Sequence, residues 1–86
     1  MKEIRRRCIC CFEKSTGKFL REIPLKRITL ENLRSIFNQS NDDDMIEVFD
    51  LDEKICSRIQ EFVIEQLDVN LYDYELHCYA VPFLGH

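Results

Sequence analysis

The sequence contains little glycine, little histidine and no long apolar run. None of its apolar runs approaches the roughly 18 residues that a membrane-spanning helix needs. The start of the chain also lacks the apolar stretch and the cleavage site of a secretory signal. We therefore expect a cytoplasmic protein that does not enter a membrane. The glycine in Lys14–Lys18 (KSTGK) stands alone in a turn-forming sequence, which argues against a phosphate-binding loop.

The shortage of histidine bears on catalysis, because nucleophilic catalysis needs a base beside the nucleophile. Of the two histidines, His86 follows Gly85 at the end of the chain, and we interpret 85–86 as the remnant of an expression tag. That leaves His77 as the candidate base, and a single histidine on a strand is more often structural. Residues 1–84 form one small domain with a modest core. We expect that the protein is not an enzyme.

The five cysteines are an odd number and include an adjacent pair: Cys8, Cys10, Cys11, Cys56 and Cys78. Reduced thiols that pack as small hydrophobic side chains suit this pattern better than disulfides. A zinc site drawn from Cys8, Cys10, Cys56 and Cys78 is the weaker alternative, because Cys8-x-Cys10 lacks the usual ligand spacing. Strand alternation predicts that His77 lies on the face opposite such a site. We expect no metal and no cofactor.

The apolar periodicity predicts the order β-β-α-β-α-β. Strands are expected over 4–12 and 19–23, joined by a turn at Gly17, then over 45–51 and 72–81. Thr29 and Asp52 are the expected caps of two helices, the second carrying an apolar stripe from Ile55 to Leu67. The chain is therefore predicted to be an α+β domain. Its sheet should be four-stranded, mixed or antiparallel, with both helices packed on one face.

Charge is divided unevenly along the chain. The net charge is -4, but residues 1–40 carry +6 and residues 41–86 carry -10. Seven carboxylates lie within 41–54 alone. A calcium loop does not fit this segment, because Ile46 and Glu47 occupy positions that need an oxygen ligand and a glycine. Provided that the fold keeps the two halves apart, the acidic half should attract a basic partner.

Acidic residues, together with tyrosines that can anchor a contact, make up the expected partner-binding surface. These residues are Asp42, Asp43, Asp44, Glu47, Asp50, Asp52, Glu61, Glu65, Asp68, Tyr72, Asp73 and Tyr74. The alternative is a small regulatory module that binds nucleic acid through its basic N-terminal hairpin. The acidic pI of about 5.1 argues against that alternative.

Four motifs resemble those of a family of short bacterial proteins. They are the hairpin FEKSTG at 12–17, the helix start LENL at 30–33, the acidic DDDM at 42–45 and the closing YDY at 72–74. Some proteins of this kind are similar to the immunity proteins of contact-dependent growth inhibition systems. The resemblance implies a binding protein that inhibits a nuclease toxin, often one that cleaves tRNA, by covering its basic active site. It implies no catalytic residue and no direct contact with nucleic acid, and it leaves the oligomeric state undefined.

Overall fold

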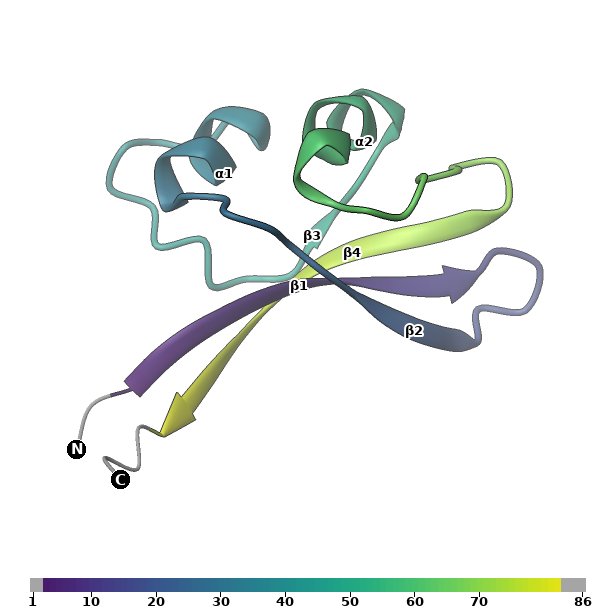
Figure 1. Cartoon of the computed structure of the whole chain (residues 1–86), viewed down its shortest axis with the longest axis horizontal. Coiled ribbons are helices and arrows are strands. Elements are labelled where there is room, and N and C mark those ends of the chain that lie inside the picture. Colours follow the sequence, from purple (N-terminus) through teal and green to yellow (C-terminus); the bar gives the residue numbers. More distant parts are fainter. Residues whose placement is uncertain (1–2, 83–86) are drawn as a thin grey trace.

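A computed structural model describes residues 3–82, and the expected tag remnant at 85–86 lies outside that range. Residues 3–82 form an α+β fold with the predicted order of elements (Figure 1). The elements are β1 (Glu3–Glu13), β2 (Phe19–Pro24), α1 (Leu30–Ile36), β3 (Phe49–Asp50), α2 (Glu53–Ile59), the 3₁₀ turn η1 (Gln60–Phe62) and β4 (Tyr72–Pro82).

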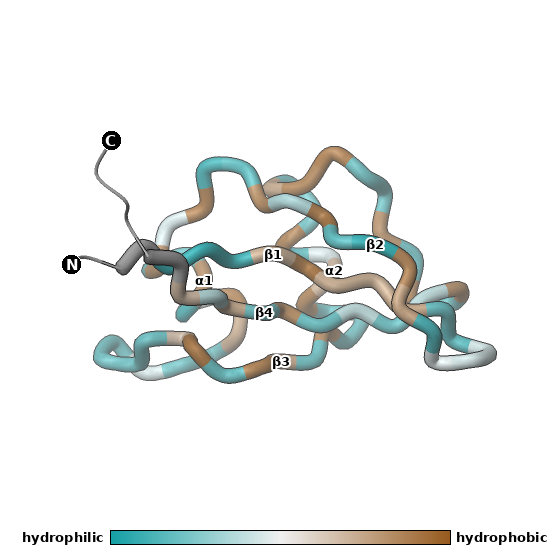
Figure 2. Tube along the Cα trace, turned by 90° about the horizontal axis from the view of Figure 1, so that it is seen from below, coloured by the Kyte–Doolittle hydropathy of each residue, from teal (hydrophilic) through white to brown (hydrophobic). Residues whose placement is uncertain are grey.

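The sheet is antiparallel, with the strand order β2-β1-β4-β3. Its centre is the pair of long strands β1 and β4, which run side by side from Glu3 opposite Pro82 to Glu13 opposite Tyr72. Both helices cover the same face (Figure 1). The side away from the helices, which we call the open face, is seen in Figure 2 with the four strands in front. The prediction of a four-stranded sheet with helices on one face is confirmed.

The hydrophobic core lies between the sheet and the helices. Strand alternation sends every second side chain of β1 and β4 toward the helices. The largest fully buried side chains come from both strands, both helices and the loop before β3: Ile9, Cys11, Leu33, Met45, Ile59 and Leu76. Ile9 lies directly opposite Leu76 across the central pair. A packed layer of this kind fixes the register, because a slip of one residue would turn every core side chain outward.

The register corrects one expectation about the faces of β4. Cys8 lies opposite His77, and Cys10 opposite Glu75. Residues directly opposite each other share a face. His77 therefore lies on the open face with Cys8 and Cys10, whereas Cys78, opposite Arg7, belongs to the other face. The alternative zinc set, which combined Cys8 and Cys10 with Cys78, is wrong for this reason.

The third strand is much shorter than the predicted 45–51. Met45 adopts a left-handed backbone conformation, with φ of 55°, and this interrupts an extended chain. The carbonyls just before and at Met45 accept hydrogen bonds from arginine side chains instead of from a neighbouring strand. Phe49 and Asp50 form the ladder with β4, and the Leu51 amide donates to the Tyr74 carbonyl at 3.0 Å. Ile46 and Val48, expected on a strand, lie on an exposed loop.

The second helix also ends earlier than its apolar stripe suggested. After Ile59 the chain tightens into η1, and Val63 is already extended. The side chain of Gln60 explains the change. Its Nε2 donates to the Glu65 carbonyl at 2.8 Å, and its Oε1 accepts from the Leu67 amide at 2.8 Å. These bonds satisfy backbone groups that a longer helix would have paired, while Val63 and Leu67 remain buried.

Over the described range, the helices are all too short and too polar to cross a membrane.

Candidate functional site

Two arginines hold the acidic loop before β3 in place. Arg7 of β1 donates from Nη2 to the Asp44 carbonyl at 2.7 Å, and Arg34 of α1 donates from Nε to the Asp43 carbonyl at 2.6 Å. The Asp43 carboxylate accepts from the Met45 amide at 2.7 Å. The arginines bind main-chain oxygens, so these contacts do not occupy the carboxylates of the loop.

Three carboxylates of the loop and of β3 are exposed to solvent. Within residues 3–82, Asp44, Glu47 and Asp50 have no hydrogen bond or ion pair from their side chains. Two neighbouring acids are engaged locally. Asp42 accepts from the Ser40 hydroxyl at 2.7 Å, which lowers the pKa of its carboxyl. Asp52 caps α2 by accepting from the Ile55 amide at 2.8 Å.

Apolar side chains alternate with these acids. Ile46 is 47% exposed and Val48 is 56% exposed. Together with Asp44, Glu47 and Asp50 they form what we call the acidic–apolar strip. The strip leads into β3, the edge strand of the sheet, where Figure 2 shows brown and teal segments following one another. Sequence reasoning identified the acids of this strip and missed the two apolar residues, because it placed them in a paired strand.

Glu65, Asp68 and Asp73 of the expected surface lie at the other end of the molecule, near the turn of the β1–β2 hairpin. Two of them, Glu65 and Asp73, pair with cations of the same chain. Arg21 makes a bidentate ion pair with Glu65, which lowers the pKa of that carboxyl. Lys14 pairs with Asp73 at 2.7 Å. The expectation that Glu65 is free for a partner is wrong, because Arg21 already occupies both of its oxygens.

The tyrosines at this end also differ from expectation. Tyr74 is only 2% exposed, and its hydroxyl accepts a hydrogen bond from the Asp68 amide at 2.8 Å. It is a core residue and cannot anchor a partner on the surface. Tyr72 is half-buried, with the guanidinium of Arg21 5.2 Å from its ring centroid. Glu61 is exposed beside α2, apart from the acidic–apolar strip.

The fold brings the two charged halves of the chain together. β1, from the basic half, pairs along its length with β4, from the acidic half. Arg7 and Arg34 bind the acidic loop, while Lys14 and Arg21 form ion pairs. The condition for an oriented field across the whole molecule is therefore not met. Exposed acids occur on several elements, and the strip is distinguished by the exposed apolar side chains that lie among its acids.

Metal-ligating side chains also converge on the open face. In the part of the chain that the structure describes, the grouped residues are Cys8, Cys10 and Glu22. Glu22 was not among the residues singled out from the sequence. The feature that could have identified Glu22 is the register of the β1–β2 hairpin, which places Cys10 opposite Glu22. That register follows from the turn geometry, which the sequence alone did not define.

Comparison with known proteins gives the chain a family and no activity. No curated protein matches it. The sequence profile of one family, described as "Domain of unknown function (DUF7683)", matches residues 6–77, from β1 to β4. This match covers most of the chain, so the protein belongs to the DUF7683 family.

Proposed function

We propose that the protein is a non-enzymatic immunity protein of the bacterial cytoplasm that binds and neutralises a nuclease toxin domain, one that cleaves tRNA. The resemblance of its four motifs to such proteins supplies the class of partner. The observation that carries the proposal is the acidic–apolar strip, in which Asp44, Glu47 and Asp50 alternate with Ile46 and Val48 on an exposed edge. A nuclease cleft that binds RNA is basic, and this strip complements it in charge.

The combination of acidic and apolar side chains in the strip matters for the affinity for the toxin domain. Nanomolar binding corresponds to about -12 kcal/mol. Exposed ion pairs contribute only about 0–1 kcal/mol each, so three carboxylates cannot reach that value. Full burial of an exposed Ile or Val contributes roughly 1.5–3 kcal/mol, and Ile46 and Val48, which are already about half covered, would add about half of that each. The apolar residues supply the desolvated anchors, and the acids supply the steering and the choice of a basic partner.

The arginine contacts support the proposal as well. Arg7 and Arg34 fix the backbone just before the strip, at Asp43 and Asp44. A loop that is already ordered loses less conformational entropy on binding, which favours a tight complex. The same contacts explain how the chain tolerates adjacent aspartates, because two cations sit beside them.

The alternative function, nucleic-acid binding through the basic hairpin, finds less support. Four cations of the first half contact groups of the same chain: Arg7, Lys14, Arg21 and Arg34. These contacts reduce the positive charge that is available to neutralise phosphates.

The test uses the purified protein and the C-terminal toxin domain encoded beside it. In one variant, Asp44→Asn, Glu47→Gln and Asp50→Asn are combined; in a second, Ile46→Ser and Val48→Ser. Calorimetry should show at least about a tenfold weaker affinity for each, equivalent to about 1.4 kcal/mol. The first variant should also flatten the dependence of affinity on salt, because it removes the screened interactions.

The matched controls are Glu61→Gln and Ile64→Ser, an exposed acid and an exposed apolar residue outside the strip. Both should bind like the wild type. Loss of affinity in the controls with none in the strip variants would overturn the assignment of the strip. A wild-type protein that neither binds the toxin domain nor protects a cell expressing it would overturn the function itself.

A further inference from the structure

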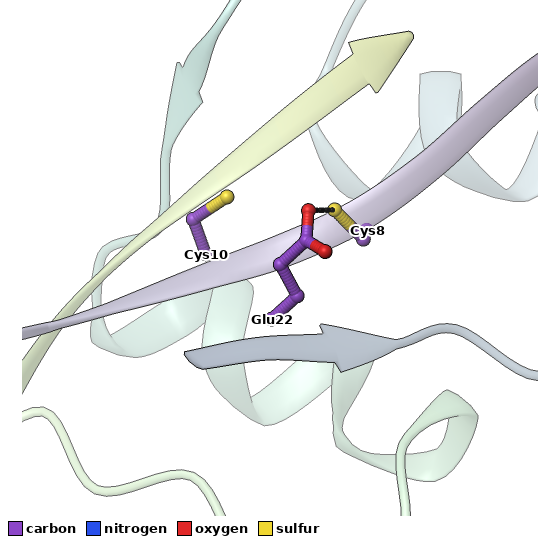
Figure 3. Close-up of side chains that lie close together, drawn as sticks. All are labelled: Cys8, Cys10 and Glu22. Carbon is purple, nitrogen blue, oxygen red and sulfur yellow. Dashed lines mark hydrogen bonds between the residues drawn. The ribbon is translucent and has the colours of Figure 1, made fainter. Parts of the chain in front are cut away.

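The open face carries a cluster of soft and hard ligand atoms that the proposed function does not use. Cys8 and Cys10 are two residues apart on β1, so their side chains point to the same side of the sheet. Glu22 reaches over from β2 (Figure 3). The two thiol sulfurs and a carboxylate oxygen of Glu22 all lie within 4.8 Å of one another.

We propose that Cys8, Cys10 and Glu22 form a binding site for a divalent cation of the zinc class. Thiolates and carboxylates are both ligands of zinc, at roughly 2.0–2.3 Å from the ion. A pair of thiolates favours zinc over magnesium or calcium, which prefer oxygen ligands alone. Ligands of a tetrahedral ion at those distances are about 3.5 Å apart. Small side-chain rotations therefore suffice to close the present spacing, with the strands unchanged.

Hydrogen bonds already hold these groups together in the free protein. The Cys8 thiol donates to Glu22 Oε2 at 3.3 Å, and the Tyr79 hydroxyl donates to the same oxygen at 2.9 Å. The sulfur of Cys10 lies 3.8 Å from the Tyr79 hydroxyl oxygen. Tyr79 thus orients the carboxylate from a third strand, β4. A neighbour that fixes a ligand in this way is a regular feature of metal sites.

The site is accessible, although one thiol is nearly covered. Cys10 is 3% exposed, whereas Glu22 is exposed and Cys8 is half-buried. A surface pocket lined by Arg6, Pro24 and Tyr79, among others, opens onto Cys8 and Glu22. An ion can reach Cys8 and Glu22 from this side, and Cys10 lies beneath them, within 4.8 Å of both ligand atoms. Binding releases the two thiol protons to solvent, as for other thiolate sites.

The other cysteines do not belong to the site. Cys11 is buried in the core beneath the sheet, and Cys56 is buried on α2. Cys78 lies on the opposite face of β4. His77 lies across from Cys8, but its Nε2 is bonded to Glu75 at 2.9 Å. Three ligands from β1 and β2 therefore hold the ion, and the fourth position is left to water.

The experiment is a titration of the reduced full chain with Co²⁺, a spectroscopic probe of zinc sites. One equivalent should produce a thiolate-to-cobalt charge-transfer band, and added Zn²⁺ should abolish it by displacement. Cys8→Ser and Cys10→Ser should each weaken or remove the band. Glu22→Gln replaces an exposed side chain and preserves the fold. It should weaken the binding of Co²⁺ by at least the roughly 10–100-fold that losing a group that only orients a ligand costs.

Cys78→Ser is the matched control, because it removes a half-buried thiol from the other face. It should bind Co²⁺ like the wild type. The proposal is overturned if the wild type gives no band at one equivalent, if the band survives in Cys8→Ser combined with Cys10→Ser, or if Cys78→Ser reduces it equally. The toxin-binding assay does not enter this test, so the failure of either proposal leaves the other intact.

Discussion

Arg21 and Glu65 illustrate how single residues join distant parts of this chain. Their bidentate pair links β2 to the segment after η1, and the Arg21 guanidinium also packs against the ring of Tyr72. A bidentate arginine pair is stronger than an ordinary surface pair, although partial exposure to water reduces its net contribution.

This pair should make the stability of the protein depend on pH. The hydrogen bonds from Arg21 lower the pKa of the Glu65 carboxyl below 4.5, so the unfolded chain binds this proton more tightly. The stabilisation is therefore complete above pH 4.5 and is lost as the pH falls through the lower pKa of the folded state. Urea unfolding should show the wild type more stable than Glu65→Gln by about 1 kcal/mol at neutral pH. In strong acid the difference should vanish.

Glu61→Gln provides the comparison, because Glu61 is exposed and lies outside the pair. Its stability at neutral pH should match that of the wild type. A Glu65→Gln protein that keeps the full wild-type stability at neutral pH would contradict this account of the pair.

Tyr74 gives a second prediction at the residue scale. Its buried hydroxyl is the acceptor for the Asp68 amide at 2.8 Å. Tyr74→Phe keeps the ring and leaves that partly buried amide without its partner, which costs about 1–3 kcal/mol. The free energy of unfolding should fall by this amount, with the same dependence on denaturant as the wild type. An unchanged free energy would mean that water replaces the hydroxyl at no cost.

At the scale of elements, both helices are too short to be stable alone. α1 and α2 have seven residues each. Isolated helices below roughly 12 residues are marginal in water. These two depend on packing against the sheet and on their caps. Thr29 and Asn32 form a reciprocal capping box at α1, and Asp52 caps α2.

Two substitutions of Asp52 can distinguish the capping hydrogen bond of α2 from the effect of the negative charge. Asp52→Ala removes the acceptor for the Ile55 amide and should destabilise the protein by about 0.5–2 kcal/mol. Asp52→Asn removes the charge and keeps a good cap, so it should lose much less. Thermal unfolding of the two variants side by side measures the difference. Equal losses would show that the charge, acting on the helix dipole, matters more than the hydrogen bond.

The elements also show what could be predicted from the sequence. Strong local signals gave the long strands and both caps, because strand alternation and the cap residues Thr29 and Asp52 act within a few residues. The end of α2 and the length of β3 depend on hydrogen bonds from side chains to backbone groups. In α2 these backbone groups are near in the sequence, and before β3 they are distant. Gln60 ends the helix, and Arg7, 38 residues away from Met45, occupies carbonyls that a strand would use. Periodicity does not report such contacts.

The candidate sites were predictable to different degrees. The acids of the strip follow from composition, whereas the exposure of Ile46 and Val48 depends on the interrupted strand. The group of Cys8, Cys10 and Glu22 depends on the register between β1 and β2. An error of one residue in that register would turn the Glu22 side chain to the other face of the sheet.

At the scale of the whole molecule, Arg7 connects the centre of the sheet to the acidic loop. It spans 37 residues of sequence to reach the Asp44 carbonyl. Hydrogen bonds from a charged group contribute about 1.5–3 kcal/mol. Their loss should let the loop open without unfolding the sheet.

Hydrogen exchange can test this connection. In Arg7→Gln, amides over 42–48 should exchange about 10–150-fold faster, the effect of about 1.5–3 kcal/mol, while those of β1 and β4 stay protected. Arg5→Gln is the control, because Arg5 is exposed on the same strand. Unchanged exchange over 42–48 in Arg7→Gln would show that Arg34 alone holds the loop.

The brevity of β3 has a consequence for solubility. A long, flat outer strand offers a template on which copies of a protein stack into aggregates. Here the outer strand on this side has two residues, and one of them is Asp50. A second copy docking in the antiparallel sense would gain few ladder bonds and would bring like charges together. The surface that we propose for binding a partner is thereby poorly suited to self-association.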